Sequence, residues 1–159
     1  MPYNPFYIAT SLSNAKNHNS VRDALQSLGY TIAYDWTLHG SVKLVSKKRL
    51  QEVAVAELKG ILQSAFVVVL LPGGKGTHFE FGYALAGKKR VFLYSEDPAS
   101  FELGPQANAF YHHPDVIQLT GCIDQVALKI HKKLHRTTCN PTCSPSILEV
   151  KPASNSIDI

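Results

Sequence analysis

The sequence is poor in cysteine and contains no long apolar run. Its 159 residues include three cysteines. A small and odd number of cysteines does not form a disulfide framework, and it favours a reducing compartment. No apolar run reaches the roughly 18 residues that a membrane helix needs. The opening segment MPYNPFYIATS has neither the basic residues nor the apolar stretch of a secretory signal. We therefore expect a cytoplasmic protein that binds no membrane.

The sequence also lacks a strong concentration of charge. It holds 16 Lys and Arg against 12 Asp and Glu, which gives a formal net charge of +4. The basic clusters are short, and none combines many arginines with interleaved aromatics, so we expect no polynucleotide partner. A mild basic excess of this kind favours small anionic substrates.

What the sequence does contain is an alternation of short apolar runs with helical patterns. The run FVVVLL is apolar at every position, which is typical of a strand buried on both faces of a parallel sheet. The alternation predicts an α/β fold of the flavodoxin/Rossmann-like type, a three-layer α/β/α sandwich around a five-stranded parallel sheet. The expected strands are Phe6–Thr10, Thr31–Tyr34, Phe66–Leu71, Val91–Tyr94 and Val116–Leu119. The expected helices are Ser20–Leu28, Ser46–Gln63, Thr77–Ala86 and Cys122–His135.

A chain of this length suits one domain with a single core, and no internal repeat is visible. We assign the domain to residues 1–136. Residues 137–159 are rich in Pro, Ser, Thr and Asn and contain few large apolar residues. This composition predicts a C-terminal tail that is flexible or lies on the surface.

A glycine-rich turn follows the all-apolar run, in the stretch LPGGKGTHFEFGYALAGKK at residues 70–88. Gly73, Gly74 and Gly76 allow backbone N–H groups to approach a ligand closely. The N-terminus of the following helix, near Thr77, adds a partial positive charge. Because ligands bind at the carboxyl ends of parallel strands, we predict that these four residues contact an anionic part of the substrate.

Two nucleotide-binding motifs are not completed by this turn. A Walker A loop requires Ser or Thr after its lysine, but Lys75 is followed by Gly76. A dinucleotide fingerprint requires a third glycine where this chain has Phe79. We therefore expect neither ATP hydrolysis nor a dinucleotide cofactor.

Glu80 admits two interpretations. The stretch Thr77-His78-Phe79-Glu80 fits a capping box, in which the Thr77 hydroxyl and the Glu80 carboxylate satisfy N–H groups of the helix. Alternatively, a carboxylate near a helix N-terminus is favoured in its anionic form. Glu80 would then stay ionised at neutral pH, as a nucleophile that attacks the anomeric carbon of a sugar requires. The spacing alone leaves both interpretations open.

Three motifs resemble those of the nucleoside 2-deoxyribosyltransferase-like superfamily, which includes 2'-deoxynucleoside 5'-phosphate N-hydrolases. The family's Glu-φ-Gly-x-Ala motif, where φ is apolar, is matched here by Glu80-Phe81-Gly82-Tyr83-Ala84. The motif of its preceding helix is matched by Glu57-Leu58-Lys59-Gly60-Ile61, with Glu57 where the family commonly has Asp. Its first strand carries an aromatic residue, as does Phe6-Tyr7-Ile8-Ala9. The resemblance covers roughly residues 6–130.

This resemblance implies cleavage or transfer at the N-glycosidic bond of a nucleoside, a deoxynucleoside or a 5'-monophosphate. Glu80 would attack C1' and form a covalent glycosyl-enzyme. Tyr7 would donate a hydrogen bond to Glu80 or to the sugar, and Glu57 would orient Glu80. The resemblance implies no metal and no cofactor. It also implies a homo-oligomer, because the family's counterpart of the segment that begins at Asn108 approaches the site of a neighbouring subunit.

Two alternative functions remain open. The stretch Pro72-Gly-Gly-x-Gly-Thr-x-x-Glu80 is similar to the phosphate-binding motif of the cytokinin-activating phosphoribohydrolases, which cleave the bond between a base and ribose 5'-phosphate. The second alternative is a non-catalytic module that senses nucleotides, in which the glycine turn only holds a phosphate.

Polar residues after the first expected strand are further candidates for substrate contacts. Thr10 and Ser11 either hydrogen-bond a phosphate or a sugar, or serve turn and cap chemistry. His18 would join such a site as a cation.

The segment after the second expected strand combines an acid, an aromatic and a histidine. Trp36 either stacks on a base or covers the core. Asp35 and His39 are candidates to protonate the leaving base, which departs more easily when it is protonated. Residues 37–46 are a candidate lid over the site. Asn108, before the last expected strand, is a further candidate for substrate binding.

Overall fold

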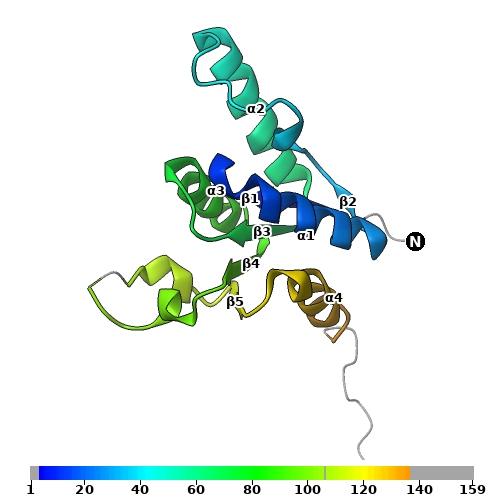
Figure 1. Cartoon of the computed structure of the whole chain (residues 1–159), viewed down its shortest axis with the longest axis vertical. Coiled ribbons are helices and arrows are strands. Elements are labelled where there is room, and N and C mark those ends of the chain that lie inside the picture. The colour runs from blue at the N-terminus through cyan, green and yellow to red at the C-terminus, as the bar shows by residue number, and fades with distance from the viewer. Residues whose placement is uncertain (1–3, 106, 137–159) are drawn as a thin grey trace, which may run out of the picture.

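The computed structural model describes residues 4–105 and 107–136, in which five parallel strands form one sheet. The strand order is β2-β1-β3-β4-β5, so the three-layer flavodoxin-like prediction is confirmed (Figure 1). The strands are β1 (Pro5–Ala9), β2 (Thr31–Ile32), β3 (Phe66–Leu70), β4 (Arg90–Ser95) and β5 (Val116–Thr120). The helices are α1 (Ala15–Ser27), α2 (Lys47–Gln63), α3 (Lys75–Ala86) and α4 (Val126–Arg136). The predicted tail, residues 137–159, lies outside the described residues.

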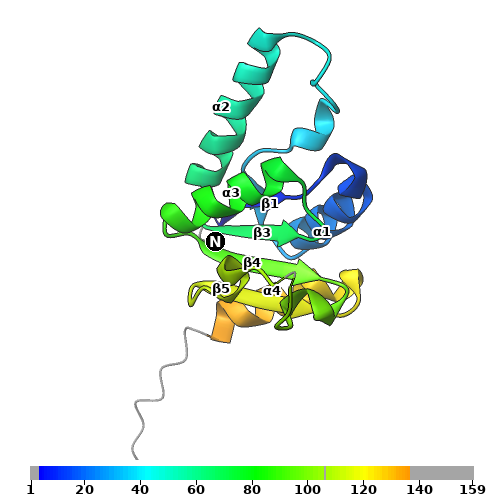
Figure 2. The same cartoon turned by 90° about the vertical axis from the view of Figure 1, so that its left-hand side faces the viewer.

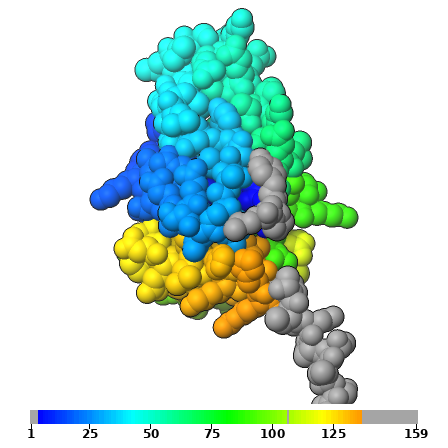
Figure 3. Space-filling model, turned by 90° about the vertical axis from the view of Figure 1, so that its right-hand side faces the viewer, coloured from blue at the N-terminus to red at the C-terminus, as the bar shows by residue number. Residues whose placement is uncertain are grey.

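The strands are buried on both faces, as the run of apolar residues in β3 predicts. Successive side chains alternate between the two faces, so each face has a core of its own. On one face Phe6, Val68 and Phe92 pack with α1 and α4. On the other face the core contains side chains of α2 and α3, among them Ile61 and Phe81. Figure 3 shows the face formed by α1 and α4, with α2 rising above it.

Only part of α2 packs against the sheet. The buried residues of this helix are Val53, Gly60 and Ile61, and its N-terminal end extends beyond the sheet (Figure 2). The contact is close at Gly60, where an added Cβ atom would lie 2.7 Å from the Tyr34 Cβ atom and 3.2 Å from the Tyr7 ring. A glycine at this position therefore allows α2 to approach β1 directly behind Tyr7.

Two helices begin earlier than the sequence pattern predicts. A 3-10 turn at Leu12–Asn14 leads directly into α1, which begins at Ala15 instead of Ser20. Helix α3 begins at Lys75 instead of Thr77. The other expected strands and helices are present, although β2 is shortened to two residues and the last helical segment begins with a 3-10 turn at Ile123–Gln125. None of the described helices combines the length and the apolar character that crossing a bilayer requires.

Candidate active site

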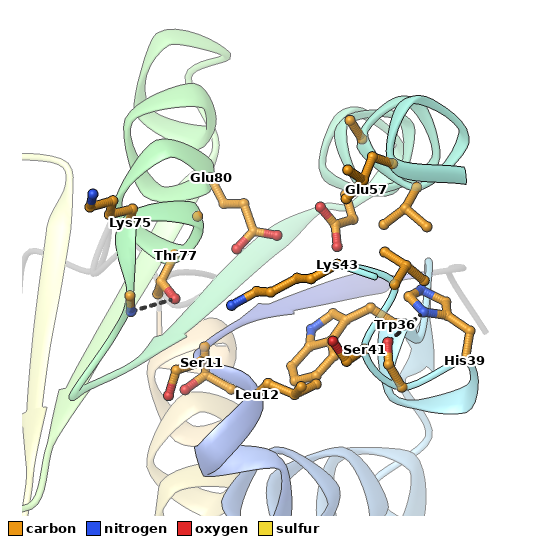
Figure 4. Close-up of a pocket in the computed structure, with 18 residues that line it drawn as sticks. Ser11, Leu12, Trp36, His39, Ser41, Lys43, Glu57, Lys75, Thr77 and Glu80 are labelled. Carbon is orange, nitrogen blue, oxygen red and sulfur yellow. Dashed lines mark hydrogen bonds between the residues drawn. The ribbon is translucent and has the colours of Figure 1, made fainter. Parts of the chain in front are cut away.

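A pocket of about 620 Å³ opens where the chain leaves β1, β2 and β3, at the carboxyl end of the sheet. This is the switch point between β1 and β3, where parallel α/β sheets place their ligands. The walls come from α3 on one side and from α2 with its preceding loop on the other (Figure 4). Many of the residues predicted for the site line this pocket: Thr10, Ser11, Trp36, His39, Glu57, Gly74, Gly76, Thr77 and Glu80.

Glu80 lies in the second turn of α3 and points into the pocket, where 7% of its surface is exposed. The Tyr7 hydroxyl, fully buried on β1, donates a hydrogen bond to the Glu80 carboxylate. The capping-box interpretation is wrong, because the residue that caps α3 is Gly74. The Gly74 N–H donates to the Thr77 hydroxyl over 3.1 Å, so the cap is complete without Glu80. Glu80 is therefore available for a role in the pocket.

Glu80 holds its proton more tightly than a solvent-exposed carboxyl does. Burial raises the pKa of Glu80 to about 8, the Tyr7 hydrogen bond opposes this rise, and the Glu57 carboxylate adds to it. The expectation that the helix N-terminus keeps Glu80 ionised was wrong, because Glu80 lies one turn deeper than predicted and burial dominates. Burial and the neighbouring Glu80 raise the pKa of Tyr7 well above its usual value, so Tyr7 remains a donor.

Glu57 faces Glu80 from the opposite wall of the pocket (Figure 4). Its side chain is half-buried on α2, and burial raises its pKa, while the nearby His39 partly opposes the rise. The hydrogen bond to the Glu80 carboxylate comes from Tyr7, and within residues 4–105 and 107–136 Glu57 makes no hydrogen bond to Glu80. Glu57 therefore shares the pocket with Glu80 and faces it, while Tyr7 makes the direct contact with Glu80.

His39 and Trp36 line the pocket with their ring nitrogens already engaged. The His39 Nδ1 atom is 2.9 Å from the Gly40 carbonyl oxygen, which can only accept, so Nδ1 carries the proton. Nε2 then accepts from the Tyr34 hydroxyl at 3.0 Å. The Trp36 indole N–H donates to the Ile8 carbonyl over 3.0 Å. Neither ring has a free N–H for a leaving base, so the structure does not favour His39 as its proton donor.

Apart from Tyr7, four sequence candidates lie outside the pocket lining: Asp35, Asn108, Gly73 and His18. Burial alone would raise the pKa of Asp35, but hydrogen bonds from Thr37 and Arg22 lower it, and the Arg22 ion pair measures 2.8 Å. The Asp35 carboxylate thus stabilises the segment around Trp36 through its bonds to Arg22 and Thr37. The Asn108 side chain accepts from the Phe110 N–H over 3.0 Å and caps a 3-10 turn at Ala109–His112.

Gly73 and His18 also support the structure around the pocket. An added Cβ atom at Gly73 would lie 2.6 Å from the Thr77 methyl group, so this glycine allows the turn to close onto α3. His18 is fully buried against Trp36, with ring centroids 4.9 Å apart. Burial lowers the pKa of His18, which makes the proposed cationic role wrong.

The residues that sequence reasoning missed come mainly from the loop before α2. Ser41, Val42 and Lys43 line the pocket together with Leu12 and the α2 residue Leu50. The candidate lid at residues 37–46 contains this loop, but no pattern singles out its individual residues. Their place in the pocket depends on the path of the loop.

Comparison with known proteins identifies both a family and a fold. The family model described as nucleoside 2-deoxyribosyltransferase matches residues 6–133. A CMP N-glycosidase of Clostridium botulinum, BcmB, superposes with a TM-score of 0.57 at 14% identity, covering 80% of this chain and 99% of that chain. A conserved protein from Enterococcus faecalis V583 superposes with a TM-score of 0.56 at 15% identity, covering 82% of this chain and 99% of that one. No curated protein matches the sequence.

The matched family acts on the N-glycosidic bond of nucleosides, by cleavage or by transfer. The family match therefore supports this general class of activity for the chain. The two solved structures share the fold of this chain. Because their sequence identity to it is low, the comparison with them concerns the fold alone.

Proposed function

This chain belongs to the nucleoside 2-deoxyribosyltransferase family, and from that premise we propose that it breaks the N-glycosidic bond of a nucleoside or its 5'-monophosphate through a covalent intermediate on Glu80. The observation that carries the proposal is the hydrogen bond from the buried Tyr7 hydroxyl to Glu80 at the wall of the pocket. A hydrogen bond of this kind fixes the direction of the carboxylate, which in-line attack on C1' requires.

Three groups share the first step. The Glu80 carboxylate attacks C1', and the bond between C1' and the base nitrogen breaks with its electron pair leaving on the base. Glu57, which faces the pocket and whose pKa is raised by burial, protonates the departing base. Tyr7 donates its hydrogen bond to Glu80 throughout. The product is an ester between Glu80 and the sugar.

The second step releases the sugar. The Glu57 carboxylate takes a proton from water, the water oxygen bonds to C1', and the Glu80 ester bond breaks. When a second base replaces water, the same step transfers the sugar. Hydrolysis and transfer therefore use the same residues and differ in what enters the pocket.

Glu80 must lose its proton before it attacks. With its pKa near 8, much of the free protein is protonated at Glu80 at neutral pH. The proposal therefore requires bound substrate, or a cation near it, to favour the carboxylate. Lys43 and Lys75 are the lysines that line the pocket.

A panel assay tests the proposed activity. The protein is incubated with nucleosides and 5'-monophosphates, with and without a free acceptor base, and released or exchanged base is measured by chromatography. We expect turnover by the wild type, loss of turnover with retained ligand binding for Glu80→Gln, and normal turnover for Glu102→Gln, which removes an exposed carboxyl outside the pocket. Binding by both variants without turnover by the wild type would indicate a nucleotide sensor instead.

We also propose that the chain forms a homo-oligomer through the outer faces of α2 and α3. Val55 and Leu62 are one heptad apart on α2 and are 68% and 52% exposed, and Phe79 on α3 is 63% exposed. Apolar side chains of this size favour burial against a second copy. Light scattering coupled to gel filtration tests this: we expect an oligomer for the wild type and a smaller species for Leu62→Glu, and a monomeric wild type would contradict it.

A further inference from the structure

Lys43 extends from the loop before α2 into the pocket. Figure 4 shows its ammonium in the space between Ser11 and Glu80, whereas the side chain of Lys75 points away from that space. The ion pairs among the described residues use Arg22, Arg49 or His113 as the basic partner, and none of the described carboxylates pairs with Lys43. An ammonium without a protein partner that points into a cavity is available to a ligand.

The groups opposite Lys43 are also hydrogen-bond donors. The Ser11 hydroxyl, two residues after the end of β1, lies 3.0 Å from the Ser13 hydroxyl and 3.4 Å from the Pro72 carbonyl oxygen. Lys75 and Gly76 are the first residues of the 12-residue helix α3 on the adjoining wall, and the N–H of the preceding Gly74 is already engaged by the Thr77 hydroxyl. The first N–H groups of a helix have no partner within the helix. The space before Lys43 is therefore bounded by an ammonium, hydroxyls and amide N–H groups, a set that suits an anion with several acceptor oxygens.

Glu80 makes a cation at this place necessary if the substrate carries a phosphate. The like charge of a bound phosphate would raise the pKa of Glu80 further, and the nucleophile would then stay protonated. An ammonium between the two negative groups offsets this repulsion. Lys43 occupies that position, while Glu57 faces Glu80 from the other wall and Tyr7 approaches it from the sheet.

We propose that Lys43 is a specificity-determining residue, which binds the 5'-phosphate of a nucleoside monophosphate and thereby selects the monophosphate over the free nucleoside. The proposal rests on the function proposed above, because it assumes that the sugar lies beside Glu80. With the phosphate between Lys43 and Ser11, the base extends toward the wall that contains Trp36, Val53 and Glu57.

Binding measurements separate this role from a general contribution to the pocket. Each common ribonucleoside and deoxyribonucleoside 5'-monophosphate, and its own nucleoside, is titrated calorimetrically into Glu80→Gln, where turnover is prevented. The tightest pair is then titrated into the same protein carrying Lys43→Met, Lys43→Arg or Lys48→Met. Lys48 is the matched control, since it is an exposed lysine in the first turn of α2 that does not line the pocket.

We expect Lys43→Met to weaken binding of the monophosphate about tenfold or more and that of the nucleoside less than about twofold, as loss of one charge-assisted hydrogen bond predicts. Lys43→Arg should stay within about threefold of the lysine protein, and Lys48→Met should change neither ligand. Equal binding of monophosphate and nucleoside before any change at Lys43, or equal weakening of both by Lys43→Met, would overturn the proposal while leaving the N-glycosidic function intact. Absence of binding by every ligand would refute both.

Discussion

Replacement of Glu80 by glutamine should make the protein more stable at high pH than the wild type. Glutamine keeps nearly the volume of the side chain and still accepts a hydrogen bond from Tyr7, but it carries no charge. Burial raises the pKa of Glu80 from its usual value of 4.5 to about 8. At about 1.4 kcal/mol per pH unit, this interval corresponds to at most about 5 kcal/mol of unfolding free energy.

The sign follows from where the proton is bound. Between pH 4.5 and pH 8 the folded wild type keeps a proton on Glu80 that the unfolded chain has released, so wild-type stability falls as the pH rises. Below this window Glu80 is neutral in both states, and above it Glu80 is charged in both. The stability of Glu80→Gln relative to the wild type should therefore increase by up to about 1.4 kcal/mol per pH unit inside the window and reach a plateau above it.

Urea denaturation of both proteins at a series of pH values from 5 to 9 measures this difference. Titrating groups that are distant from Glu80 are present in both proteins and cancel in the difference, whereas the coupling of Glu80 to Glu57 is part of the measured effect. A stability difference that is independent of pH across the window would refute the reasoning, because it would mean that Glu80 is already ionised at neutral pH in the folded protein.

Three further changes test the support of the site. Tyr7→Phe removes the hydrogen bond to Glu80, so we expect kcat to fall at least about tenfold with a smaller change in KM; unchanged kcat would contradict a role for Tyr7. Gly60→Ala places a Cβ atom 2.7 Å from the Tyr34 Cβ atom, so we expect a loss of about 1–3 kcal/mol in urea unfolding together with reduced activity, and full stability would show that α2 can move without cost. Thr77→Ala removes the acceptor of the Gly74 N–H and should lower the unfolding free energy by about 1 kcal/mol, which Thr77→Ser should largely restore.

The fold is predictable from the sequence because its signals are local and repeated. The all-apolar residues of β3 predict a strand buried on both faces, and the helical spacing in α2 predicts a helix buried on one face. The structure confirms both predictions. The start of α3 is less predictable. Thr77 followed by Glu80 matches a capping box in spacing. In the structure, however, the Thr77 hydroxyl accepts a hydrogen bond from the Gly74 N–H, and the helix begins earlier, at Lys75.

Pocket residues are predictable from the sequence only where they belong to a recognisable motif. Glu80, Glu57 and Tyr7 are identified by resemblance, and the structure places the first two in the pocket lining and the third in contact with Glu80. Lys43 lies in a loop without periodicity, so its direction depends on the folded path of the chain. Likewise, the engagement of both nitrogens of His39 depends on partners that only the folded structure brings together.

The ionisation state of Glu80 shows the same limit. From the sequence, the nearby helix N-terminus favours the carboxylate, but the fold buries the side chain, and the cost of burying a charge exceeds the effect of the helix. The charge state of a buried acid depends on its whole surroundings, which spacing along the chain does not specify.

The central claim is tested most directly by looking for the sugar on Glu80. A 5'-monophosphate that the panel assay identifies as a substrate, in its 2'-fluoro form to slow release of the sugar, is incubated with the protein, and the quenched sample is digested and analysed by mass spectrometry. The account predicts a peptide containing Glu80 whose mass has increased by that of the sugar phosphate, and no such peptide from Glu80→Gln. Turnover without any adduct, together with activity retained by Glu80→Gln, would contradict it.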